Sequence, residues 1–148
     1  MEFIESEFLI ETVVPKNELI ISKTDLNGII TYANEAFAKI SGYSVEELVG
    51  QPHNIVRHPD MPKRIFEDMW SKIKNRQKWK GVVKNLRKDK GFYWVNARIT
   101  GVYTDGELEG FKSIRIPVEY EQKLEYQKLY DSFRSLDKEN IRKVIYQS

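Results

Sequence analysis

The hydrophobic pattern of the chain begins with two short runs of β-forming residues, which predict a strand pair. Residues 19–22 and 29–32 flank a turn, residues 25–28, whose Asn-Gly pair can adopt positive φ. Asn34 then stands where a helix should begin, because its side chain can accept a hydrogen bond from the first turn. Gly42 is expected to end this first, short helix.

Two further helices are predicted after this point. Ser44 and Glu47 have the spacing of a capping box and predict a single short turn of helix. Asp60 is expected to cap a longer helix, with Pro62 in its first turn, where proline is tolerated. The longer helix is indicated by an apolar stripe at helical spacing: Ile65, Phe66, Met69, Trp70 and Ile73.

From residue 79 onward the pattern changes to a period of two, which is typical of strands. Turns at residues 88–91 and 105–106 divide this part into three strands, the last over residues 108–116. The alternation places four residues of the first of these strands on one face: Trp79, Gly81, Val83 and Asn85.

The last part of the chain is predicted to be helical. Residues 119–146 contain no glycine or proline and alternate in charge. A short heptad-like seam runs along this segment: Tyr126, Leu129, Phe133, Leu136 and Asn140.

The order of these elements predicts an α+β fold. It is a five-stranded antiparallel sheet with its helices grouped between the second and third strands, followed by a C-terminal helix. We expect an N-terminal cap over residues 1–17, a sensor domain over residues 18–117 and a C-terminal signalling helix over residues 118–148.

Composition narrows the range of functions. The 148 residues favour one domain, and 24 basic against 22 acidic residues leave no patch suited to nucleic acid or an anionic membrane. No apolar run approaches the about 18 residues of a membrane span. The absence of cysteine removes disulfides, thiolate metal sites and cysteine nucleophiles, and is compatible with the reducing cytoplasm, where we expect the protein.

Enzyme and metal functions are not expected. The chain has no G-x-S-x-G, Walker or G-x-G-x-x-G motif. His53 and His58 do not form an H-x-x-x-H pair on a helix, and neither has carboxylates at zinc-site spacing.

The candidate chemistry lies in a polar segment, residues 53–60, and on the strand that begins at residue 79. Arg57 could bind a phosphate or a carbonyl-rich ring, or form a surface ion pair. His58 could stack on a ligand or donate to it, or make a structural hydrogen bond. Asp60 is a helix cap first and a ligand contact second.

Asn85 leaves two interpretations open. If its strand face is inward, the amide is buried and needs partners worth about 1–3 kcal/mol to offset its desolvation. A heterocycle with paired donors and acceptors would supply them, and so would neighbouring backbone or water. Trp70 and Trp79 are expected in the core, although either could also face a ligand.

Several motifs together resemble a PAS domain over residues 18–117. They are N-G-I-I-T-Y-A-N-E-A-F, S-G-Y-S-V-E-E-L-V-G, and W-K-G followed by N-L-R-K-D-K-G-F-Y-W-V. More narrowly, G-Q-P-H-N-I-V-R-H-P-D-M-P is similar to the PAS domain of bacterial aerotaxis and redox receptors. This resemblance implies an energy-taxis sensor that holds FAD non-covalently. It further implies that the redox state is relayed to a chemoreceptor signalling domain or another PAS-coupled signalling protein.

The resemblance also implies which residues form the flavin pocket: Asn34, Arg57, His58, Asp60, Trp79 and Asn85. Trp70 joins them as a candidate ring from the apolar stripe. The photoreactive cysteine of light-sensing relatives is missing, so adduct photochemistry is excluded. Two alternatives remain open: a haem PAS domain with His53 or His58 as iron ligand, and a cofactor-free module that forms a homodimer through the N-terminal cap or the C-terminal helix.

Overall fold

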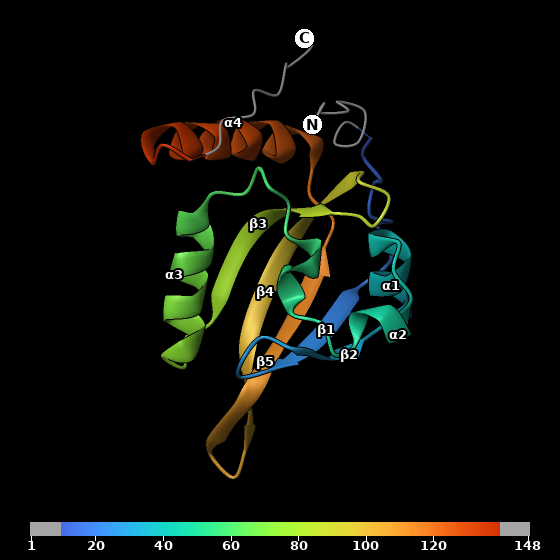
Figure 1. The fold of residues 1–148 in the computed structure, drawn as a ribbon, viewed down its shortest axis with the longest axis vertical. Coiled ribbons are helices and arrows are strands. Elements are labelled where there is room, and N and C mark those ends of the chain that lie inside the picture. The colour runs from blue at the N-terminus through green and yellow to red at the C-terminus, as the bar shows by residue number, and fades with distance from the viewer. Residues whose placement is uncertain (1–9, 140–148) are drawn as a thin grey trace.

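The computed structural model describes residues 10–139 of the chain (Figure 1). Five strands form one antiparallel sheet in the order β2-β1-β5-β4-β3. Four helical segments lie between β2 and β3 in the chain and gather on one face of this sheet, and α4 crosses one end of the molecule. The predicted α+β architecture, with its helices between the second and third strands and a helix after the sheet, is confirmed.

The predicted strands form close to their expected positions. β1 (Ile20–Asp25) and β2 (Ile30–Ala33) pair across a turn in which Gly28 has φ 81°. β3 (Trp79–Leu86), β4 (Phe92–Thr104) and β5 (Glu107–Ile116) make the rest of the sheet.

The helix caps that the sequence predicted for the first two helices are also confirmed. α1 (Glu35–Ser41) begins at Asn34, whose Oδ1 accepts from the Phe37 amide at 3.0 Å. It ends at Gly42, which is in the left-handed conformation with φ 80°. α2 (Val45–Leu48) begins with a complete capping box formed by Ser44 and Glu47.

Asp60 does not cap the longer helix, which corrects that prediction. α3 (Lys63–Lys74) begins after Pro62 with no side-chain cap, and Lys63 N–H instead donates to Glu139 Oε1 at 3.0 Å. The Asp60 carboxylate is buried and lies 3.3 Å from Lys84 Nζ and 3.4 Å from Arg134 Nη1. Two buried cations attract a carboxylate more strongly than the backbone amides of a helix end do.

The heptad-like seam predicted for the last helix is wrong by about one residue. α4 (Tyr120–Leu136) buries Gln127, Tyr130 and Arg134, whereas Leu136 of the seam is 70% exposed. The reason is tertiary: the Tyr130 ring stacks on Trp94 of β4, and its hydroxyl donates to the Val82 carbonyl of β3. Asn140, and the predicted helix beyond residue 139, lie outside the described residues.

The described part of the N-terminal segment lies beside the start of β4. Glu11 forms an isolated parallel bridge with Phe92, and its carboxylate pairs with Lys123 of α4 at 2.6 Å. In residues 10–139, none of the helices combines the length and the hydropathy that a bilayer crossing needs.

Candidate functional site

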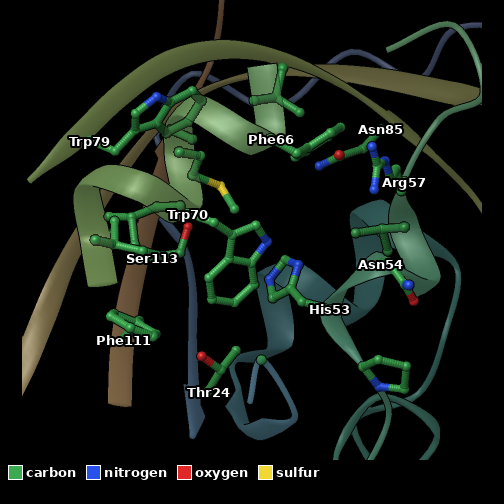
Figure 2. A pocket seen from close by; sticks show the side chains of 18 of the residues that line it. Thr24, His53, Asn54, Arg57, Phe66, Trp70, Trp79, Asn85, Phe111 and Ser113 are labelled. Carbon is green, nitrogen blue, oxygen red and sulfur yellow. The ribbon is translucent and has the colours of Figure 1, made fainter. Parts of the chain in front are cut away.

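A cavity of about 220 Å³ lies between the sheet and the helices that follow β2. Its walls come from β1, β3, β4 and β5 on the sheet side, and from the short 3-10 helix η2 (His53–Val56) and α3 on the other. Figure 2 shows the main lining side chains: Thr24, His53, Asn54, Arg57, Phe66, Trp70, Trp79, Asn85, Phe111 and Ser113. With the residues that Figure 2 does not label, the larger share of the lining is apolar or aromatic and the rest is polar, which is the usual make-up of a small-molecule site.

Asn85 and Arg57 form one polar side of the cavity (Figure 2). The backbone of Arg57 makes an isolated antiparallel bridge with that of Asn85, so the polar segment runs along the free edge of β3. Asn85 is 5% exposed, and the Arg57 guanidinium lies 3.9 Å from the centre of the Phe66 ring. The strand face that carries Asn85 is therefore inward, and the Asn85 amide and the Arg57 guanidinium lie on the same side of the cavity.

Aromatic side chains supply flat walls. The Trp79 indole donates to Asp68 Oδ2 at 3.2 Å and lies over Gly81, where a Cβ atom would come within 2.4 Å of the ring. Trp70 packs edge-on against Phe111 at 5.9 Å between ring centres. Figure 2 shows the Trp70 indole in the middle of the group, so it fills part of the space between the walls.

A polar cluster around one cation stands at the cavity wall: Arg115 and Ser113 of β5 and His53 of η2 line the cavity, and Ser22 of β1 contacts both Arg115 and His53. Arg115 donates to Ser22 Oγ and to Ser113 Oγ, and His53 Nε2 lies 3.1 Å from Ser22 Oγ. Burial, with the Arg115 charge adding to it, lowers the pKa of His53 to about 3, so the imidazole is neutral. Burial also lowers the pKa of Arg115 to about 10, which still leaves the guanidinium charged.

Sequence reasoning missed Arg115. The one available signal was its place in β5, because Phe111, Ser113 and Arg115 alternate onto the same inward face. A charged residue in a strand is expected to face solvent unless it is known which face of the sheet is buried.

Three of the predicted site residues lie outside this cavity. His58 and Asp60 are buried on the other side of the segment, in a network with Lys84 and Arg134. Asn34 joins β1 to α1, accepting from Ile21 N–H and donating to the Leu19 carbonyl at 2.8 Å. The structure therefore brings Arg57, Trp70, Trp79 and Asn85 together at the cavity, places Asn34 and Asp60 in contacts within the fold, and places His58 at the adjoining groove.

An open groove of about 1350 Å³ lies beside the cavity, at the start of α3 and the end of α4. The two spaces adjoin, because five residues line both of them: Asn27, Asn54, Arg57, Phe66 and Trp70. Charged residues of both signs line its walls: Lys63, Lys74, Arg134 and Lys138, and the acids Glu67, Asp137 and Glu139.

The chain belongs to the PAS fold family, whose model matches residues 30–115. It is 42% identical over 124 residues to the aerotaxis receptor of Escherichia coli K12, a match that covers 84% of this chain and 24% of that protein. It is 35% identical over 115 residues to the nitrogen fixation regulatory protein of Klebsiella pneumoniae, covering 77% of this chain and 23% of that one. The chain thus spans about a quarter of the length of these relatives.

Solved structures agree with the fold. A PAS domain from Colwellia psychrerythraea superposes with a TM-score of 0.62 at 29% identity, covering 68% of this chain and 86% of that one. The light-state structure of the blue-light photoreceptor Aureochrome1 LOV gives a TM-score of 0.63 at 19% identity, covering 81% of this chain and 92% of that one. The chain is a PAS sensor domain related to the aerotaxis receptor.

Proposed function

We propose that this domain is a cytoplasmic redox sensor that binds FAD non-covalently, with the flavin ring in the cavity. The observation that carries the proposal is the placement of Asn85 and Arg57 together beside aromatic walls. The Asn85 amide offers a donor and an acceptor to a heterocycle edge, and the Phe66, Trp70 and Trp79 rings offer flat apolar surface to its faces. FAD supplies reversible electron uptake when bound.

The groove fits the rest of a dinucleotide. Arg57 stands where the cavity and the groove meet, and Lys63 and Lys74 lie further along. Guanidinium and ammonium groups bind phosphate oxygens, so Arg57 and one of these two lysines, which stand at opposite ends of α3, would hold the diphosphate. The similarity to the aerotaxis receptor supports the same proposal.

The cavity is smaller than the about 300–1,000 Å³ usual for such sites. We propose that the ring is admitted when the Trp70 indole turns aside. Quenching of tryptophan fluorescence on binding, reduced in a Trp70→Phe variant, is the expected sign of this movement.

The polar segment gives a route from the cavity to α4. Arg57 lines the cavity, and Asp60 of the same segment pairs with Arg134 of α4. On β3, Lys84 is the chain neighbour of Asn85 and also pairs with Asp60. A change in the hydrogen bonds made at Asn85 would bias the docking of α4, a two-state element that a chemotaxis-type signalling partner could read.

The test is an FAD titration of ligand-free protein, followed by flavin fluorescence. Asn85→Ala and Arg57→Ala should each weaken binding about tenfold or more, since each removes a buried or charged hydrogen-bond partner. Asn96→Ala and Arg98→Ala are matched controls, because both residues lie on the opposite face of β4 from the cavity-lining Val95 and Ala97. Retention of full affinity in both cavity variants, or no uptake by the wild type, would contradict the proposal.

A further inference from the structure

Arg115 is a buried cation whose contacts are all uncharged. It is 2% exposed, and its guanidinium lies 4.5 Å from the centre of the Phe37 ring. Its Nη1 donates to Ser22 Oγ at 3.1 Å and to Ser113 Oγ at 2.9 Å, and lies 3.4 Å from His53 Nε2. Among residues 10–139 no carboxylate lies within ion-pair distance of it, and its buried Nε has no hydrogen-bond partner there.

The titratable neighbours of Arg115 do not supply a negative charge. His53 is neutral, for the reason given above. Burial raises the pKa of Tyr93 to about 12, so its hydroxyl keeps its proton. The positive charge of Arg115 therefore stands alone at the wall of the cavity.

Two other buried cations, Lys84 and Arg134, are paired with a carboxylate. Lys84 and Arg134 are as deeply buried as Arg115, and both lie within 3.4 Å of the Asp60 carboxylate. Burying a charge without a counter-charge costs more than burying a pair, because solvation is lost and no attraction replaces it. The fold compensates two of these three cations internally and leaves the one that lines the cavity without an acid.

We infer that Arg115 is a specificity-determining residue that selects the anionic, reduced form of the ligand in the cavity. The inference rests on the proposed function. Uptake of two electrons and one proton by the oxidised flavin ring leaves one negative charge on it, and in the test below dithionite supplies the electrons. Arg115 would pair with that charge and hold the reduced ligand more tightly than the oxidised one.

The first test uses the ligand-free protein and needs no flavin. Arg115→Met should raise the thermal midpoint, because it removes an uncompensated buried charge and keeps a long apolar side chain. Lys84→Met is the matched control and should lower the midpoint, because it leaves Asp60 with one cation fewer. A midpoint of Arg115→Met that falls as far as that of Lys84→Met would assign Arg115 a structural role and overturn the inference.

The second test is a redox titration of the FAD-loaded protein. Arg115→Gln should reduce the preference for the reduced ligand at least tenfold, which for a two-electron couple is a fall in midpoint potential of about 30 mV. Arg115→Lys keeps the charge and should restore part of the potential.

The outcomes separate the two proposals. Flavin uptake by the wild type together with an unchanged potential in Arg115→Gln would overturn the inference and leave the proposed function standing. Failure of the wild type to take up any flavin would overturn the proposed function and, with it, the redox role of Arg115.

Discussion

Replacing Asp60 by Asn should weaken the packing of α4 on the rest of the domain. The Asp60 carboxylate is 2% exposed and faces Lys84 Nζ at 3.3 Å, Arg134 Nη1 at 3.4 Å and His58 Nδ1 at 3.7 Å. Asparagine has nearly the same shape and has no charge. The substitution therefore leaves two buried cations facing a neutral amide.

The expected loss follows from what each cation retains. Removing one partner of a buried ion pair costs about 3–5 kcal/mol. Lys84 keeps Gln127 Oε1 at 2.8 Å, and Arg134 keeps Asp131 on its own helix, so the lower end of that range applies. A loss of about 3 kcal/mol should lower the thermal midpoint by roughly 6–12 °C.

The assay is urea unfolding followed by tryptophan fluorescence, with amide hydrogen exchange to locate the change. Exchange should accelerate mainly in α4, because Arg134 is one of the three residues that α4 buries. Asp137→Asn is the control: it breaks an ion pair with Arg64 whose two side chains are 34% and 40% exposed, and should change the midpoint little. Equal effects of the two substitutions would refute the reasoning, and so would an Asp60→Asn protein as stable as the wild type.

Three further predictions concern single side chains. Gly81→Ala should push the Trp79 ring out of place and weaken FAD binding about tenfold, while exposed Lys80→Ala should not; equal affinities in a fluorescence titration would contradict this. His53 has a folded-state pKa of about 3, below its usual 6.5, so the stability present above pH 6.5 is lost as the pH falls toward 3. Between pH 7.5 and 5 this loss should be about 2 kcal/mol smaller in His53→Gln than in the wild type, as measured by urea unfolding at both pH values. An equal loss in the two proteins would contradict the prediction. Tyr130→Phe should cost about 1 kcal/mol in the same assay, because Val82 loses a buried hydrogen-bond donor; an unaltered midpoint would argue against that contact.

The local features of this fold could be predicted from the sequence because the contacts that produce them are local. Asn34 and Ser44 cap helices through amides only three residues away, and both predictions are confirmed. The alternation from residue 79 correctly grouped Trp79 and Asn85 on one face, since strand geometry fixes that relation whatever the rest of the chain does.

The features that failed depend on contacts between distant parts of the chain. Asp60 meets Lys84 and Arg134, which are 24 and 74 residues away, and these cations outweigh a nearby helix end. Tyr130 rather than Leu129 faces the sheet because Trp94 and Val82 offer it a ring and a carbonyl.

The same distinction between local and distant contacts applies to the candidate site. The sequence pointed to the polar segment, yet Arg57 lines the cavity, His58 lines the groove, and Asp60 pairs with Arg134 of α4. The bridge to Asn85 holds Arg57 at the edge strand, and the turn at Pro59 and Asp60 then brings the Asp60 carboxylate to Lys84 and Arg134. Arg115 could not be identified because nothing local marks a charged residue in β5 as inward.

The most direct test of a flavin sensor that signals through α4 is amide hydrogen exchange on FAD-loaded protein, oxidised and dithionite-reduced. We expect the two states to differ in residues 57–61 and in α4, with β2, which does not line the cavity, unchanged as an internal reference. The Asp60→Asn protein should show fast α4 exchange in both states. FAD-loaded protein whose α4 exchanges identically in the two states would contradict the account.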